Sequence, residues 1–515
     1  MTTTDARSQD GDDSELPDEE VSKAALKGGR WLPAAQMVNQ GSRIVTSLVL
    51  ATLLTTEDFG LVAVATIVMA LIDRLSNLGT GQAIIQRKGL DDRLTAAIST
   101  LNTTIGLTLG GAVIAFAVPI TAVVGGSDAN AASALMRVLG VNIIIQSFGV
   151  VPFALIRRRF KFEKAAIALV SGGLTYGTVS IALAIAGFGP WSLVVGTVSG
   201  TVVSVSLSTL FSGWRPRWSF DLQAIRSVAS FSLGLTGTNI FNYATQNVDR
   251  SLIAHWLGVG PLGVYVLGVR VLRSPLILVT STVNQVMVPV LSRLQDDFAG
   301  QRRHFLTVSA TTMLVVAPAM LGLAVLADPL VEVALPERWA EAADLIEVMA
   351  PIGVARALWG LVSPLYVANA RTGRQFVWSL IIGSLLIASY IVTARFSILA
   401  VVIGIGVVHV VASPIFFMMS FRIIELRVRD YFKAIAPAGL IAGTMAGLVY
   451  GTRVFGDSQG WSSLTQVVVG IAAGVVVYLA MVIALKPRGY ESLLRLLNTK
   501  ALSKNVPLFR RMARS

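Results

Sequence analysis

Arginine is the residue type in this chain whose placement points to chemistry. Five arginines lie within long apolar stretches rather than between them: Arg43, Arg250, Arg270, Arg273 and Arg356. A guanidinium group donates paired, charge-assisted hydrogen bonds to phosphate or carboxylate oxygens. A cation in the middle of a membrane costs about 2.5–3.5 kcal/mol on insertion scales, so these side chains must face one another or a water-filled cavity. They predict a site for an anionic ligand.

Acidic residues in the same stretches are fewer than the arginines. Counting Arg74 and Arg137 gives seven arginines, against the three acids Asp73, Asp249 and Glu347. Internal ion pairs cannot neutralise all seven, which favours a cationic cavity. Asp249 and Asp73 are candidates for coupling to an ion. Two structural alternatives stay open: Asp249 pairs with the arginine that follows it to hold two helices together, and Arg74 pairs with Asp73 or extends to the headgroups.

Neutral polar side chains follow one face of two apolar stretches. They recur at steps of three and four residues, which is the spacing of one stripe on an α-helix. We expect both stripes to line the cavity that holds the arginines. The alternative, that they form hydrogen bonds between helices, stays open. The residues are Gln36, Asn39 and Gln40 in the first stripe, and Asn239, Asn242, Tyr243 and Gln246 in the second.

The apolar stretches that carry these residues define the class of protein. The chain has 515 residues, of which 54% are hydrophobic and only 14% are charged. About fourteen stretches of roughly 20 residues are each long enough to cross a bilayer core of about 30 Å. Because a helix satisfies its own backbone polar groups, the sequence predicts an all-α integral membrane protein. The predicted segments are 31–54, 58–82, 96–120, 132–156, 166–187, 190–212, 229–256, 261–291, 305–327, 342–368, 375–394, 397–421, 434–455 and 463–485.

Basic residues in the loops between these segments predict the orientation. Loops of even number hold twenty Lys and Arg residues, whereas loops of odd number hold only Arg338, Arg395 and Arg453. This alternation follows the positive-inside rule without a break in phase. It predicts a multi-pass protein of the cell membrane with both termini in the cytoplasm.

An internal repeat relates the two halves of the chain. A shift of 203 residues aligns Gly60 with Gly263 and brings the two polar stripes into register. Further along the chain the shift becomes 212, which pairs Arg159 with Arg371. The unit is six helices, an even number, so both copies have the same orientation. The sequence predicts two parallel six-helix lobes around a central cavity, followed by two C-terminal helices.

The repeat divides the chain into lobes and tails. The N-terminal tail is acidic and is predicted to be disordered rather than a signal peptide. For the basic C-terminal tail, a disordered segment and an amphipathic helix on the inner leaflet are both open. The predicted parts are the acidic cytoplasmic tail 1–30, the N-terminal lobe 31–212, the cytoplasmic linker 213–228, the C-terminal lobe 229–421, the two further helices 434–485 and the basic cytoplasmic tail 486–515.

Composition excludes several classes of function. There is no cysteine and there are only three histidines, so we expect no metal site, no cofactor and no thiol chemistry. The net charge of +13 lies mostly in cytoplasmic loops and the C-terminal tail, where anionic lipid rather than nucleic acid is the expected counterpart. Nucleophile–base pairs, carboxylate pairs and phosphate-binding glycine loops are lacking. We therefore do not expect an enzyme.

Several runs of residues resemble the polysaccharide transporters of the multidrug/oligosaccharidyl-lipid/polysaccharide exporter superfamily. The resemblance extends from about residue 31 to 425, and the chain departs from it at Thr55–Thr56, where relatives usually have a proline. The runs are Leu50–Ala65, Leu78–Leu90, Pro152–Phe162, Gly187–Gly196, Asn247–Gly268 and Val286–Asp297.

This resemblance implies a flippase that moves a polyprenyl-pyrophosphate-linked oligosaccharide to the outer leaflet by alternating access of two lobes. The arginines would hold the pyrophosphate, and the polar stripes would meet the sugars. The expected partners are this lipid-linked substrate, membrane lipids and, as an open question, a polysaccharide polymerase or glycosyltransferases. A drug or cation antiporter of the same superfamily and a flippase of the peptidoglycan lipid precursor are the alternatives. An antiporter should line its cavity with acids, which the excess of arginine disfavours.

Overall fold

The computed structural model describes residues 31–76, 80–86, 91–124, 129–215, 217–219, 221, 247–491 and 494. These residues form α-helices joined by short turns, together with a 3₁₀ turn at Glu337–Trp339. The all-α class predicted from the apolar segments is confirmed for this part of the chain. Within a bilayer such helices leave no backbone polar group exposed to lipid.

The helices of the N-terminal half span residues 31–212. They are α2 Trp31–Leu53, α3 Thr56–Ser76, α4 Thr80–Gln86, α5 Asp92–Val124, α6 Ala129–Arg158, α7 Phe162–Ile185 and α8 Trp191–Ser212.

The helices of the C-terminal half follow from residue 247. Residues 247–257 are helical. The others are α10 Val259–Arg293, α11 Phe298–Val325, α12 Ala327–Ala334, α13 Glu341–Gly360, α14 Ser363–Ala368, α15 Thr372–Thr393, α16 Ile398–Phe421, α17 Val428–Ser458 and α18 Ser463–Leu485.

Ten helices of the described residues are long and apolar enough to cross a membrane. Helix α2 is outside this set, because Gln36, Asn39, Gln40 and Arg43 lower its hydropathy. Each predicted segment overlaps described helical residues; of segment 229–256 only residues 247–256 are described. The multi-pass membrane protein is thereby confirmed, and the count of fourteen spans stays a prediction.

The predicted segment 342–368 is divided into two helices, α13 and α14. Pro364 occupies the first turn of α14, where a missing backbone N–H costs nothing. The apolar pattern continues through residues 361–362, so hydropathy alone did not reveal this break. Segment 58–82 contains α3 to Ser76 and α4 from Thr80, and residues 77–79 lie outside the described part.

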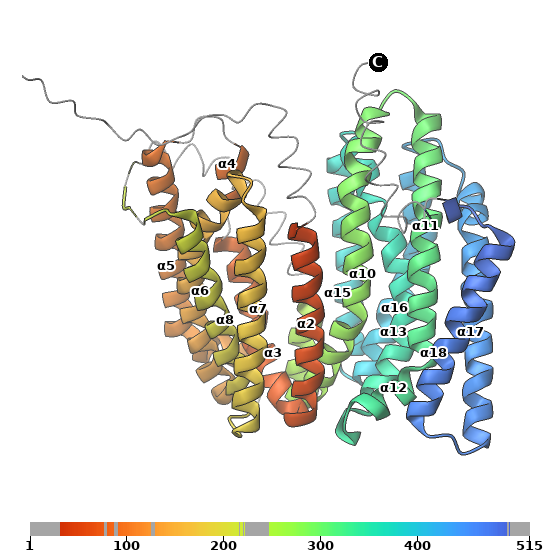
Figure 1. The fold of residues 1–515 in the computed structure, drawn as a ribbon, viewed down its shortest axis with the longest axis horizontal. Helices are drawn as coiled ribbons and strands as arrows, with labels where there is room; N and C mark the ends of the chain where they lie inside the picture. The colour runs from red at the N-terminus through yellow and green to blue at the C-terminus, as the bar shows by residue number, and fades with distance from the viewer. Residues whose placement is uncertain are drawn as a thin grey trace, which may run out of the picture.

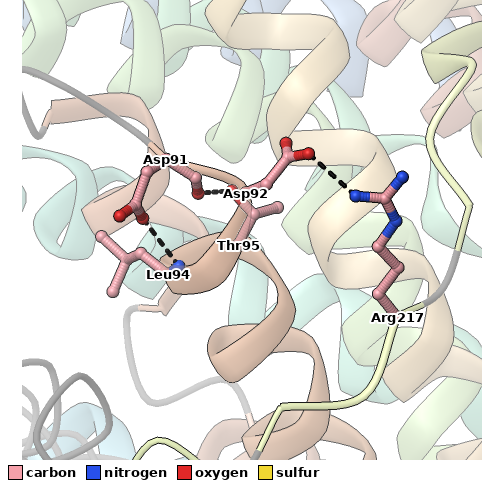
Figure 2. Close-up of polar contacts among 5 residues, drawn as sticks. All are labelled: Asp91, Asp92, Leu94, Thr95 and Arg217. Carbon is pink, nitrogen blue, oxygen red and sulfur yellow. Dashed lines mark hydrogen bonds and ion pairs between the residues drawn. The ribbon is translucent and has the colours of Figure 1, made fainter.

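The N-terminal end of α5 is capped by Asp91 (Figure 2). Its carboxylate accepts a hydrogen bond from the Leu94 amide at 2.7 Å, and the Thr95 hydroxyl donates to the Asp91 carbonyl at 2.9 Å. Arg217, which follows α8, donates to Asp92 at 2.9 Å with both side chains exposed. Such an exposed pair stabilises little. It nevertheless places the end of α8 beside the start of α5.

The helices form two groups, with α2, α3 and α10 between them (Figure 1). Helices α5, α6, α7 and α8 pack together on one side, where α2 packs on α7 and α3 on α6. On the other side α10 packs on α11 and α13, and α17 packs on α11 and α18. The two groups contact each other chiefly through α3 and α10. This arrangement agrees with two lobes joined at a narrow interface.

The crossing of α3 and α10 is reciprocal. A Cβ atom at Gly60 would overlap the Val259 carbonyl, and one at Gly263 would overlap the Thr56 carbonyl. Thr56 and Val259 are the first residues of the two helices. Positions 56 and 259 differ by 203, as do 60 and 263, which is the shift found in the sequence. The two backbones touch at equivalent positions, and each position requires glycine.

A second equivalence occurs where α6 and α14 end. Phe160 and Ala370 both have left-handed backbones, with φ of 54° and 53°. In both turns a backbone amide reaches back five residues, from Lys161 to the Ile156 carbonyl and from Arg371 to the Tyr366 carbonyl. These turns are 210 residues apart rather than the 212 expected from matching residue types. The left-handed turn residues pair Phe160 with Ala370, a shift of 210 residues. Matching residue types instead pairs Arg159 with Arg371, a shift of 212 residues.

Candidate functional site

A cavity of about 340 Å³ lies between the two groups of helices. We call it the central cavity, and its walls come from α2, α3, α7, α8, α10 and residues 247–257. Three arginines reach it from three separate segments: Arg43, Arg250 and Arg270. Gln40 lines it as well. Among the described residues that line this cavity there is no carboxylate.

Arg270 connects the two halves across the central cavity. Its guanidinium on α10 donates a hydrogen bond to the Ser47 hydroxyl on α2 at 2.6 Å. The Ser47 hydroxyl in turn donates to the Arg43 carbonyl at 2.8 Å. The hydrogen bond to Ser47 of the N-terminal half therefore orients the Arg270 side chain across the cavity.

Arg43 and Arg270 approach the same aromatic side chain. The Arg43 guanidinium lies 5.3 Å from the centre of the Tyr176 ring, a cation–π contact. Arg270 is also near Tyr176, and the charges of Arg43 and Arg250 act on Arg270. Three like charges that repel one another around one cavity favour an anion there.

The other two predicted arginines have different positions. Arg273 lies on α10 one turn after Arg270, with its side chain outside the described part. Arg356 on α13 is exposed and does not line the central cavity. It is close enough to Asp249 and Tyr390 to act on them electrostatically. Its assignment to the anion site stays a prediction.

Asp249 is buried in the C-terminal half, with 7% of its surface exposed. Its carboxylate accepts hydrogen bonds from the Tyr265 hydroxyl at 2.5 Å and from the Arg250 backbone amide at 2.8 Å. The Arg250 guanidinium is not among the ion pairs found for the described residues. Successive residues of a helix point in different directions, so Asp249 faces the protein interior while Arg250 faces the cavity. The side chain of Asp73 lies outside the described part.

The predicted polar stripes are only partly described. Gln40 lines the central cavity, whereas Asn39 lines a neighbouring one. Gln36 is exposed and lines neither. The whole second stripe lies outside the described residues; it comprises Asn239, Asn242, Tyr243 and Gln246.

The neighbouring cavity, of about 350 Å³, lies within the N-terminal group between α2, α6, α7 and α8. We call it the N-terminal cavity. It shares Arg43, Tyr176 and Thr197 with the central cavity, so the two are adjacent. This cavity was not among the sites predicted from the sequence. The available signal was the series of hydroxyl residues at 197, 201, 204 and 208, which lie on one face of α8.

One end of the central cavity is closed by contacts between the two halves. The Trp339 indole is fully buried, donates to the Ala51 carbonyl at 2.8 Å and packs edge-to-face on Phe59 at 5.2 Å. Arg338 donates to the carbonyls of Thr52 at 2.9 Å and of Ala51 and Leu54 at 3.2 Å. These carbonyls end α2, which has no basic residue of its own in its last turn. A cation from the other half supplies the cap.

Residues 49–344 match the model of a family described as "Polysaccharide biosynthesis protein". The lipopolysaccharide biosynthesis protein WzxC of Escherichia coli (strain K12) is 24% identical over 418 residues, which is 80% of this chain and 84% of that protein. The teichuronic acid biosynthesis protein TuaB of Bacillus subtilis (strain 168) is 24% identical over 484 residues, 92% of this chain and 98% of that protein.

Solved structures share the fold at low sequence identity. The lipid II flippase MurJ in an inward closed conformation superposes with a TM-score of 0.72 at 15% identity, covering 90% of this chain and 99% of that one. An inward-facing multidrug resistance transporter of the MATE family superposes with a TM-score of 0.62 at 14% identity, covering 79% of this chain and all of that one.

Proposed function

This chain belongs to the polysaccharide biosynthesis protein family, and we propose that it is a flippase for a polyprenyl-pyrophosphate-linked oligosaccharide destined for a cell-surface polysaccharide. The family match confirms the resemblance drawn from the sequence motifs. Relatives named for the biosynthesis of lipopolysaccharide and teichuronic acid support a substrate of this class. Polymerases or glycosyltransferases are the proposed partners, and the cytoplasmic membrane is the proposed location.

The convergence of Arg43, Arg250 and Arg270 on the central cavity carries the proposal. A pyrophosphate is a compact anion with several acceptor oxygens, and guanidinium groups bind such oxygens in pairs. The three arginines come from both halves of the chain, so a bound pyrophosphate would contact both. We further propose that Arg273 and Arg356 assist, because both lie on helices that pack together, α10 and α13.

The rival functions receive less support. A drug or cation antiporter should present carboxylates to its cargo, and the described lining of the central cavity contains none. The lipid II flippase MurJ shares the fold of this chain, but at 15% sequence identity this similarity is evidence for the fold and not for the substrate. Membership of the polysaccharide family favours a saccharide for surface polymers.

The arrangement of the helices supports alternating access. The two halves touch through α3, α10 and the Arg338–Trp339 pair at the end of the molecule where the α2–α3 turn lies. Helix α4 and the turn between α10 and α11 lie at the opposite end (Figure 1). The basic loops predict that this opposite end is cytoplasmic. The conformation is then inward-facing, with two repeated lobes closed on the outer side.

Asp249 is the proposed site of coupling to an ion gradient. It is a buried carboxylate held by Tyr265 in the half that must move, and an ionisable residue inside a membrane marks a functional site by default. Binding of a cation or proton would neutralise it. The charge of Arg356 acts on the same carboxylate and would sense that change. Asp73 is a second, weaker candidate for this role.

The test of the proposed function uses host cells that lack the protein. They should accumulate a polyprenyl-pyrophosphate-linked saccharide in the inner leaflet, and the wild-type chain should restore surface polysaccharide. A double Arg43→Gln and Arg270→Gln variant should fail to restore it at equal abundance in the membrane. Arg137→Gln is the matched control, because Arg137 is exposed on α6 and lines neither cavity. Full export by the double variant would contradict the cationic site.

A further inference from the structure

Hydroxyl side chains form one continuous face of α8 within the N-terminal cavity. Thr197, Thr201, Ser204 and Ser208 all line it, and their steps of four, three and four residues place them on one side of the helix. The helix also carries Ser192, Ser199, Ser206, Thr209 and Ser212, which do not line this cavity. The four hydroxyl residues on this face line the cavity.

These hydroxyls present acceptor oxygens to the cavity. Thr197 donates to the Leu193 carbonyl at 2.7 Å, Thr201 to the Thr197 carbonyl at 3.0 Å and Ser208 to the Ser204 carbonyl at 2.7 Å. These three hydroxyl hydrogens are therefore used within the helix, and the oxygen lone pairs remain. Lone pairs along a wall suit a ligand that carries several O–H donors.

The opposite wall offers a further acceptor. The Asn39 amide oxygen on α2 is buried and has no hydrogen-bond partner among the described residues. It lies against Gly173 so closely that a Cβ atom there would overlap it. The oxygen is covered by this contact, so it is the rest of the Asn39 side chain that lines the cavity. Gln146 on α6 lines the same cavity and can both donate and accept.

Aromatic rings and size restrict the ligand further. Tyr176 and Phe153 line the N-terminal cavity and can pack against the apolar face of a sugar ring. Arg43 is the one charged side chain in its described lining. The cavity volume of about 350 Å³ is at the lower end of the ~300–1,000 Å³ range of ligand pockets, which suits a small part of an oligosaccharide.

We propose that the N-terminal cavity is a carbohydrate subsite that binds the first sugars of the substrate and selects among saccharides. This proposal rests on the proposed function, because the pyrophosphate in the central cavity brings the sugar to the shared residues Arg43, Tyr176 and Thr197. Sugar hydroxyls donate to the α8 oxygens and to the Gln146 amide. Selection follows from the number and direction of these acceptors.

Binding to the full-length purified protein tests the subsite. One probe is farnesyl pyrophosphate, which has no sugar; the other is the polyprenyl-pyrophosphate saccharide fraction extracted from host cells that lack the protein. The Thr201→Val and Ser204→Ala double variant should bind the saccharide fraction about tenfold more weakly and farnesyl pyrophosphate as wild type does. Thr209→Val is the control. The Thr209 hydroxyl also donates to the carbonyl four residues earlier, that of Val205, but Thr209 does not line the cavity.

The outcomes separate the subsite from the function on which it rests. Unchanged binding of farnesyl pyrophosphate shows that the double variant is folded and that the anion site is intact. Equal binding of the saccharide fraction by wild type and the double variant would overturn the subsite and leave the flippase proposal standing. A wild-type protein that binds neither probe would overturn both.

Discussion

Gly60 of α3 and Gly263 of α10 lie in a reciprocal crossing, each against the first residue of the other's helix. The two glycines are 203 residues apart. Gly60 lies against the carbonyl of Val259, and Gly263 lies against the carbonyl of Thr56. Buried side chains of both helices, Phe59 and Leu262 among them, belong to the same hydrophobic core around this contact. We expect the crossing to hold the outer side closed.

Replacing either glycine should shift the protein away from the inward-facing state. Gly60→Leu or Gly263→Leu forces a side chain onto a carbonyl, and overpacking of this kind typically costs about 1–3 kcal/mol. The outer ends separate and the cytoplasmic ends approach. The chain has no cysteine, so spin labels at Glu163→Cys and Thr372→Cys report the distance between the halves without background.

Gly443→Leu is the matched control for this experiment. Nothing lies within 4 Å of a Cβ atom at that position, so the label distance should match that of wild type. A wild-type distance in both the Gly60 and the Gly263 variants would show that the crossing does not hold the outer side closed.

Loss of Arg338 should open the outer side without affecting anion binding. Arg338→Gln removes charge-assisted hydrogen bonds to the carbonyls of Thr52, Ala51 and Leu54, each worth about 1.5–3 kcal/mol, while the Trp339 indole still donates to Ala51. A cysteine at Thr66, which lines the central cavity, should then react faster with a membrane-impermeant thiol reagent added from outside.

Arg395→Gln serves as its comparison. Arg395 is the other outer-loop arginine of the C-terminal lobe, and its guanidinium lies over the Trp256 ring, 5.1 Å from the ring centre, rather than at the end of α2. Its variant should label at the wild-type rate. Equal rates of thiol labelling in Arg338→Gln and wild type would show that Arg338 does not hold the outer side closed.

Neutralising the cavity arginines should weaken anion binding without lowering stability. Arg43→Gln and Arg270→Gln each remove charge-assisted bonds, so the affinity for farnesyl pyrophosphate should fall about tenfold or more. Because the arginines repel one another, the unfolding temperature without ligand should stay the same or rise. Calorimetric titration and thermal unfolding measure the two effects. A fall in both would indicate a structural role instead.

Neutralising Asp249 should uncouple transport from its driving gradient. Asp249→Asn keeps the size of the side chain and a hydrogen bond with Tyr265 but removes the charge. Proteoliposomes with an imposed proton or sodium gradient should then transport at a rate that no longer depends on the gradient. Tyr265→Phe keeps the charge and should retain the dependence. If Asp249→Asn retains it as well, coupling lies elsewhere.

Much of the fold could be read from the sequence, because a membrane restricts the choices. A chain in lipid must be helical, and the charges of its loops alternate with its topology. The break at 361–362 could not be read, since hydropathy continues across it and a turn is set by backbone geometry. The similar left-handed turns at Phe160 and Ala370 could not be predicted from the sequence for the same reason.

The candidate site was predictable in its residue types and less so in its grouping. A helical stripe tells which residues share a face, but the direction of that face depends on neighbours. Arg270 reaches Ser47 from 223 positions away, and Trp339 reaches Ala51 from 288. Such contacts follow from packing between distant segments, for which a single sequence gives no direct signal.

By itself the sequence determined that this is a helical membrane protein and that arginines exceed acids within its apolar segments, and it predicted a repeat that aligns Gly60 with Gly263. Only the tertiary structure decided that Arg43, Arg250 and Arg270 share one cavity, that Asp249 turns to Tyr265, and that the α8 hydroxyls line a second cavity. The composition of a helix and the spacing of its polar residues can be read from its own sequence. The rotation of a helix toward its neighbours is fixed by packing, where backbones approach through glycine and side chains fill what remains.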